Sequence, residues 1–202
     1  MKRIVIFLAL ARILAAQVTL TLTGPPAIYA GQTAVLTISL SGSAGQNLAS
    51  MQWTLPASLN FSAPSAGLAS LLASKAVSCN QGACSCVASG VNSYAYADGT
   101  VATIVLTAGT TLGTVSVPLS GLLGASTTAT AVAIASGPTY SFLTVSPCDY
   151  NQDGSVNYVD VLALINAIQG NVACLATFTP GCSMNSLKAV ATYARGSPCT
   201  LL

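Results

Sequence analysis

The chain has 202 residues, of which 52% are hydrophobic and only 5% are charged, with a formal net charge of +2. This composition excludes a disordered chain, which needs low hydrophobicity, and a nucleic-acid-binding protein, which needs a basic patch. No uncharged apolar run reaches the roughly 18 residues of a membrane-spanning helix, so we expect no stable membrane span. The length allows one good-sized core and a small second unit.

Residues 1–16 have the pattern of an export signal. Two basic residues precede an apolar run over 4–14, and Ala15 to Gln17 offers a cleavage point. Arg12 interrupts the run, and a buried N-terminal helix is the alternative interpretation. Export predicts a secreted, extracellular protein. Removal of this segment leaves a nearly neutral chain, because half of the basic residues lie within it.

From residue 17 to about 145, Val, Ile and Leu alternate with Thr and Ser. This alternation is typical of strands with one buried face. Gly, Pro, Ser and Asn interrupt it, and no helical pattern intervenes. We therefore expect a mainly β fold over residues 17–146, an antiparallel β-sandwich or jelly roll of about eight or nine strands. The expected strands lie within 18–24, 33–42, 49–55, 99–109, 113–121, 128–136 and 139–145.

Three features of this region bear on function. Trp53 is in phase with the apolar residues of its expected strand, which favours a place in the core over a role as a sugar-binding platform. Asp98 and Gly99 lie between two expected strands, which is most simply a tight hairpin turn. Tyr94 and Tyr96 would share one face of a strand, where they either stack on sugar rings or are simply half-buried.

After Pro147 the alternation gives way to helical periodicity, so residues 147–202 form a second, small α-helical unit. Residues 159–170 and 186–196 are the expected helices, and each ends in a Gly that suits a C-cap. The two segments superpose at an offset of 26 residues, which indicates a weak internal duplication. One face of the first helix is apolar, with Val161, Leu164, Ile165 and Ile168.

The loop before the first helix, "DYNQDGSVNYVD" (149–160), contains three of the four acidic residues of the chain. A twelve-residue loop of this kind can wrap the roughly six to eight oxygen ligands that calcium needs. Gly154, at position 6, permits the sharp turn. The alternative is a polar turn that ends in a capping Asp. We predict a calcium site with ligands Asp149, Asn151, Asp153, Ser155 through its carbonyl, Asn157 through water, and Asp160.

The second copy has lost these ligands. Leu175, Thr177, Thr179 and Ser186 replace the carboxylates and the amide at positions 1, 3, 5 and 12, so this half holds no calcium. It has cysteines instead. We hypothesise that Cys174–Cys182 closes the second loop and that Cys148–Cys199 joins the ends of the unit.

The remaining cysteines, Cys79, Cys84 and Cys86, are odd in number, so one of them is unpaired or bonds another chain. Their pairing stays open. Disulfides fit an exported protein. A cysteine zinc site is the competing interpretation, although the spacing gives no pair of CxxC motifs.

Residues 148–170 resemble the dockerin family, through Asp or Asn at positions 1, 3 and 5, Gly at 6, a hydrophobic residue at 8 and Asp at 12, with no entering EF-hand helix. The resemblance implies that positions 10 and 11, Tyr158 and Val159, contact a cohesin partner; packing against their own chain is the alternative. The segments "GPPAIYAGQTAVLTISLSG" (24–42) and "LASMQWTLPASLNFSAPSAG" (48–67) make the first unit similar to a cohesin or a related carbohydrate-binding jelly roll.

The sequence offers no set of residues that is suited to catalysis. Glycoside hydrolysis usually needs two carboxyl groups, and outside the calcium loop the chain has only Asp98. The absence of His removes the commonest general base. We therefore expect no enzyme. The resemblance implies instead a secreted, calcium-binding interaction module of the cohesin and dockerin type, in extracellular polysaccharide-degrading assemblies. The alternatives are a carbohydrate-binding sandwich with a calcium-stabilised C-terminus and a purely structural surface protein.

Overall fold

The computed structural model describes residues 17–80, 85–196 and 199. The predicted export segment 1–16 and Cys84 lie outside these residues. No helix in the described ranges is long and apolar enough to cross a membrane.

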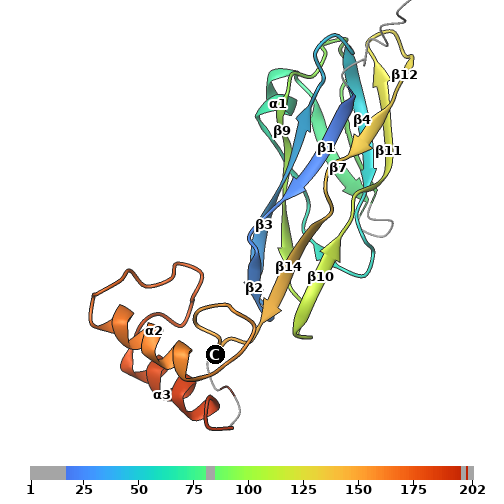
Figure 1. Ribbon diagram of the computed structural model, residues 1–202. Helices are drawn as coiled ribbons and strands as arrows, with labels where there is room; N and C mark the ends of the chain where they lie inside the picture. Colours follow the sequence, from blue (N-terminus) through green and yellow to red (C-terminus); the bar gives the residue numbers. More distant parts are fainter. Residues whose placement is uncertain (1–16, 81–84, 197–198, 200–202) are drawn as a thin grey trace, which may run out of the picture.

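The described residues form fourteen strands and three helices (Figure 1). The strands are β1 (Val18–Thr23), β2 (Ala27–Tyr29), β3 (Thr33–Ser41), β4 (Leu48–Thr54), β5 (Asn60–Phe61), β6 (Ser65–Ala66), β7 (Ala76–Asn80), β8 (Ser85–Ser89), β9 (Gly99–Thr107), β10 (Gly113–Val117), β11 (Ser120–Ser126), β12 (Ala131–Val132), β13 (Ile134–Ser136) and β14 (Tyr140–Val145). The helices are α1 (Leu68–Leu72), α2 (Tyr158–Ile168) and α3 (Met184–Tyr193).

The strands form a sandwich, as the alternating pattern predicts. One sheet has the order β13-β1-β3-β9-β5, with β6 also on β9, and the other has the order β12-β11-β4-β8-β7. A three-stranded sheet, β10-β14-β2, lies at the end nearest the C-terminal helices (Figure 1). The expectation of purely antiparallel sheets is wrong at two places, because β1 pairs with β13 and β14 pairs with β2 in parallel.

The core lies between the two large sheets. Alternate residues of β1, β3 and β9 point inward from one sheet, among them Leu20, Ile38 and Ile104. Met51 and Trp53 of β4 meet them from the other sheet, and both are buried. Each such side chain contributes about 1.5–3 kcal/mol through burial. The prediction that Trp53 belongs to the core is confirmed.

Several elements differ from the sequence prediction. The expected strand at 113–121 is divided into β10 and the start of β11, and 128–136 is divided into β12 and β13. The pair β7–β8 and the five-residue helix α1 were not expected at all. These strands are rich in Ser, Ala and Cys and show little alternation, and α1 has only five residues, too few for a helical period to be recognised.

Asp98 does not form a hairpin turn. The strands on either side of it, β8 and β9, belong to different sheets, so the intervening segment crosses the sandwich. Its carboxylate accepts hydrogen bonds from the Ser43 hydroxyl at 2.6 Å and from the amides of Ser43 and Gly42 at 2.8 and 3.0 Å. The Ser43 hydroxyl and then its amide hold the pKa of Asp98 below its usual value. A tertiary contact with the loop after β3, and not a local turn, therefore explains this acid.

The predicted Tyr94–Tyr96 face is also absent. Both residues lie in the irregular segment between β8 and β9, where no pleat alternates their side chains. Tyr94 is 63% exposed, whereas Tyr96 is 3% exposed and packs in the sandwich core. The chain therefore has no paired aromatic platform for sugar rings at this place.

Candidate metal centre

The predicted calcium loop leads directly into α2. Asn157 is the N-cap, and its side-chain oxygen accepts the amide of Val159 at 2.7 Å. The Asp160 carboxylate reaches back to the amide of Asn157 at 2.9 Å, which completes a capping box. These bonds satisfy amides that the first turn of a helix leaves without partners.

Asp160 also joins the beginning of the loop to its end. Its side chain is completely buried. While one carboxylate oxygen accepts the amide of Asn157, the other accepts the amide of Asn151 at 3.0 Å. Asp160, the last position of the predicted ligand set, therefore holds the main chain of Asn151 (position 3) and of Asn157 (position 9) in place.

Asp149, the first position, is completely buried as well. It accepts the amide of Gly154 at 2.8 Å and the amide of Asp153 at 3.2 Å. Gly154 has φ of +93°, a conformation that Gly adopts without steric cost. The pKa of Asp149 is raised to about 6, chiefly by burial; the negative charges of Asp160 and Asp153 also raise it, and the hydrogen bonds from the amides of Gly154 and Asp153 oppose the rise.

The other predicted ligands form the exposed side of the same loop. Asn151 donates through its amide nitrogen to Asp153 at 2.9 Å, and the amide of Ser155 donates to the other Asp153 oxygen at 2.8 Å. The carbonyl of Ser155 accepts the Asn157 side-chain amide at 3.4 Å. All six predicted ligands therefore belong to one hydrogen-bonded loop.

The donor set fits a hard cation on chemical grounds. Within the described ranges, no three His, Cys, Asp or Glu side chains converge closely enough to hold a metal by themselves. Loops of this length, however, also use amide and main-chain oxygens and water. Among the same residues, no basic side chain bonds to Asp149 or Asp160. A positive charge near the two buried carboxylates would offset their desolvation and their mutual repulsion.

The second loop, which precedes α3, is closed by different interactions from the first. α3 begins at Met184, 26 residues after the start of α2, and its N-cap Ser183 accepts the amide of Ser186 at 3.2 Å. Ser186, which replaces Asp160, is buried and donates its hydroxyl to the carbonyl of Gly181 at 2.7 Å. A neutral hydroxyl thus closes this loop where a carboxylate closes the first.

The disulfides agree with the predicted pairing. Cys174 bonds to Cys182 across the second loop, and Cys148 bonds to Cys199 across the whole C-terminal unit. The pairing of the three cysteines of the sandwich, which the sequence left open, is established in part. Cys79 on β7 bonds to its register partner Cys86 on β8.

The C-terminal unit lies at one end of the sandwich (Figure 1), and three aromatic residues, from strand β2 and from the two loops, pack together at the junction. The Tyr29 hydroxyl, from β2, donates to the carbonyl of Tyr150 in the first loop at 3.3 Å. Phe178, from the second loop, makes edge contacts with both rings, at 6.0 Å from Tyr29 and 5.0 Å from Tyr150. Sequence analysis missed this junction, since each residue comes from a different segment and none carries a motif.

The two faces of α2 differ. Val161 and Leu164 are buried in the second core, and Ile165 and Ile168 pack against it, as the helical period predicts. Tyr158, Val159 and Leu162 are 67%, 55% and 44% exposed. The alternative in which Tyr158 and Val159 pack against their own chain is therefore wrong.

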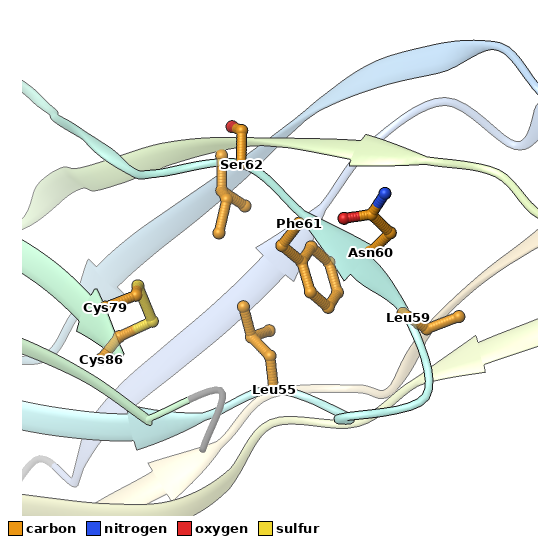
Figure 2. A pocket seen from close by; sticks show the side chains of 8 residues that line it. Leu55, Leu59, Asn60, Phe61, Ser62, Cys79 and Cys86 are labelled. Carbon is orange, nitrogen blue, oxygen red and sulfur yellow. A yellow bond between two sulfur atoms is a disulfide. The ribbon is translucent and has the colours of Figure 1, made fainter. Parts of the chain in front are cut away.

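A small pocket lies in the sandwich, away from the loop. Figure 2 shows Leu55 and Phe61 pointing toward one another beside the Cys79–Cys86 disulfide. Its volume is about 80 Å³, and its polar lining comes from Asn60 and Ser62. None of the residues that line it carries an acid or base that could activate the Ser62 hydroxyl.

Comparison with solved structures finds this fold in chains of very different sequence. A non-cellulosomal cohesin from the hyperthermophilic archaeon Archaeoglobus fulgidus is similar with a TM-score of 0.50 and 15% identity, over 65% of this chain and 93% of that one. A cohesin module from a Clostridium perfringens family 33 glycoside hydrolase has a TM-score of 0.45 and 9% identity, over 64% and 96%. No family model matches the chain, and no curated protein matches it.

The likeness to the archaeal cohesin shows the fold: the sandwich of this chain is cohesin-like. At 15% identity, it carries no information about a partner or ligand.

Proposed function

We propose that the chain is a secreted, non-catalytic protein-interaction module in which a cohesin-like sandwich carries a calcium-binding, dockerin-like unit. The observation that carries the proposal is the pair of buried carboxylates, Asp149 and Asp160, inside a loop with calcium-ligand spacing, with no basic partner among the residues that the structure describes. A divalent cation would offset their repulsion and their desolvation.

Each ligand has a separate structural role. Asp149 would hold calcium from the turn at Gly154, and Asp160 would hold it from the first turn of α2. Asn151 and Asp153 would complete the set from the exposed side, with the Ser155 carbonyl and a water held by Asn157. Bound calcium would supply the positive charge that these oxygens coordinate, which would lower the free energy of the ordered loop relative to the unfolded chain.

The ordered loop would control the partner contact. Tyr158 and Val159 follow the N-cap directly, so their direction depends on where Asp160 starts the helix. Exposed Tyr and aliphatic side chains on a rigid element suit a protein interface. The cohesin-like fold of the sandwich supports an extracellular, protein-binding role for this chain. Within that role, we place the chain in polysaccharide-degrading assemblies. The lack of His, with Asp98 held by a loop, supports a non-catalytic role.

Calcium titration of the purified chain, lacking residues 1–16, tests the proposal. We expect calorimetry to show one calcium per chain and weaker binding of magnesium, which prefers a smaller, octahedral site. Asp149→Asn and Asp160→Asn should each abolish the heat of binding. Asp98→Asn is the matched control, because it removes the one carboxylate outside the loop. Absence of calcium binding by the folded wild-type chain would refute the proposal.

A further inference from the structure

One peptide group connects the sandwich to the predicted metal ligands. It joins Tyr150 to Asn151, the second and third positions of the predicted calcium loop. Its carbonyl accepts the hydroxyl of Tyr29, on β2 of the sandwich, at 3.3 Å. Its amide donates to the carboxylate of Asp160 at 3.0 Å. Because a peptide group is planar and rigid, a change at the Tyr29 hydroxyl is transmitted to Asp160 through the orientation of this one plane.

The positions of the loop alternate between the metal site and the rest of the protein. The predicted ligands before α2 lie at odd positions, and the even positions make contacts elsewhere. Gln152, at position 4, donates its side-chain amide to the Thr177 hydroxyl at 3.2 Å. Gly154, at position 6, lies so close to β14 that a Cβ on it would be 3.1 Å from the side chain of Leu143. Val156, at position 8, packs against the second core. A movement of the loop relative to the sandwich would therefore also move the ligands.

The loop begins directly at the end of the sandwich. Only residues 146–148 separate the end of β14 from Asp149 (Figure 1). The carbonyl of Ser146 accepts the amide of Asp149 at 2.9 Å, and the side chains of Ser146 and Tyr29 are both buried. The first predicted ligand is therefore placed by a strand of the sandwich and not by the helices that follow.

We propose that the sandwich is part of the calcium site, with Tyr29 as a positioning residue, and that calcium binding and docking of the C-terminal unit on the sandwich strengthen each other. This rests on the proposed function, in which the loop binds calcium. With calcium bound, Asn151 and Asp160 are held on the ion, and the peptide plane between them and Tyr29 stays in place. Without calcium, the buried carboxylates are no longer compensated, and the loop shifts away from Tyr29. Linkage makes the effect reciprocal, so docking raises the calcium affinity by the factor by which calcium favours docking.

The contacts of Tyr150 within its own unit do not provide this coupling. Its hydroxyl accepts the amide of Leu175 at 3.3 Å, and its ring lies 5.0 Å from that of Phe178. Both partners belong to the second loop, which its disulfide closes. The contacts of the first loop with Tyr29 and Leu143 cross from one unit to the other, and these are the contacts that calcium controls in our proposal.

Calorimetric calcium titration of the chain lacking residues 1–16 tests the positioning role. Tyr29→Phe keeps the ring and removes the hydroxyl, so we expect the calcium dissociation constant to rise about threefold to tenfold, the value of one net hydrogen bond. Leu143→Ala removes the side chain that packs beside Gly154 and should weaken binding about tenfold. Neither residue is a predicted ligand, so each variant should still bind one calcium per chain.

Tyr140→Phe is the matched control. Tyr140 is the first residue of β14, at the end of the strand that lies away from the loop. Its hydroxyl donates to the carbonyl of Pro25 at 2.6 Å, within the sandwich. The control therefore removes a shorter hydroxyl-to-carbonyl bond than Tyr29→Phe does, and should leave the calcium affinity unchanged. An equal loss of affinity in Tyr140→Phe would contradict a specific role for Tyr29.

Nitration with tetranitromethane, followed by peptide mass spectrometry, measures docking itself, because the reagent modifies accessible Tyr rings. Tyr29 is 4% exposed, and we expect it to be protected in calcium and modified in EDTA. The wild-type chain contains its own references. Tyr96, in the sandwich core, should stay protected in both buffers, and the exposed Tyr94 and Tyr158 should react in both. In Leu143→Ala, Tyr29 should react at calcium concentrations that still protect it in the wild-type chain.

Two outcomes would overturn the coupling. One is wild-type calcium affinity in both Tyr29→Phe and Leu143→Ala, and the other is a Tyr29 that is protected equally in calcium and in EDTA. Both leave the proposed function intact, because the wild-type chain would still bind calcium. A folded wild-type chain that binds no calcium contradicts the proposed function itself, so the two failures are distinguishable in the same titrations.

Discussion

The two loops of the C-terminal unit have similar arrangements but are held closed by different interactions. Each precedes a helix, each has a polar N-cap, and the two helices start 26 residues apart. The first loop closes through the buried carboxylates of Asp149 and Asp160. The second closes through the Cys174–Cys182 disulfide and the hydroxyl of Ser186.

The difference shows what a buried carboxylate requires. Asp160 accepts two amides, but it is completely buried, and in our proposal a cation compensates the charge of its carboxylate. Ser186 donates to a carbonyl and carries no charge, so its loop needs none. In our proposal, the first loop therefore responds to calcium concentration, whereas the disulfide of the second persists under oxidising conditions.

The largest expected effect comes from removing the carboxylate that closes the first loop. Calcium at about 100 times its dissociation constant should stabilise the wild-type chain by about 2.7 kcal/mol. Asp160→Ala should lose this gain and, by leaving the amides of Asn151 and Asn157 without a partner, lose a further roughly 1–3 kcal/mol. Thermal denaturation with calcium and with EDTA measures both the stabilisation by calcium and the loss from the two unpartnered amides.

The informative comparison is the difference between the two melting temperatures of each protein. It should be large for the wild-type chain and zero for Asp160→Ala. An equal calcium response in both proteins would contradict the role of Asp160 and the distinction between the loops.

The disulfides should come next, in the order of the chain lengths they close. Cys148 and Cys199 are separated by 51 residues, and replacing both with Ala should lower the free energy of unfolding by about 4 kcal/mol. Cys174 and Cys182 are separated by 8, and the same change should lower it by about 2.5 kcal/mol. Denaturant unfolding of the two double variants measures these values. Loss of calcium binding in the Cys174→Ala, Cys182→Ala variant would show that the loops are not independent.

The parts that were predictable from the sequence have a local physical signature. Strands β1, β3, β4, β9 and β14 each bury alternate residues, so their period of two is visible in the chain. The loop before α2 was visible because three of the four acids in the chain lie within it. The paired cysteines followed from the comparison of the two copies.

The parts that were not predictable depend on contacts between distant segments. The partner of Asp98 is the loop at residues 42–43, some 55 positions away, so local turn chemistry gave the wrong answer. Tyr96 enters the core from an irregular segment, where no period could indicate its direction. Helix α1 was missed because its five residues are too few for the helical spacing of its leucines to stand out.

A smaller effect is expected at the serine that closes the second loop. Ser186→Ala removes the hydroxyl bonds to Gly181 and Ser183, and should lower the free energy of unfolding by about 1 kcal/mol. The loss should be the same in calcium and in EDTA, because this loop holds no metal in our proposal. Denaturant unfolding in both buffers tests it, with Thr192→Ala as a control that removes an equivalent hydroxyl from the other end of α3. A calcium-dependent loss would mean that the two loops share one site.

The smallest effect is expected at Asp98, which shows how a carboxylate behaves when water can reach it. Like Asp160 it accepts two amides, but it is exposed and needs no cation. Its pKa is lowered by the Ser43 bonds, so it contributes stability that is fully present above the ordinary Asp pKa of about 3.9 and is lost as the pH falls through the lowered value. Asp98→Asn should therefore be slightly less stable than the wild-type chain at pH 7 and equally stable at pH 2, with no change in its response to calcium. Thermal denaturation across this range measures the convergence, and a difference that widens toward low pH would contradict the assigned hydrogen bonds.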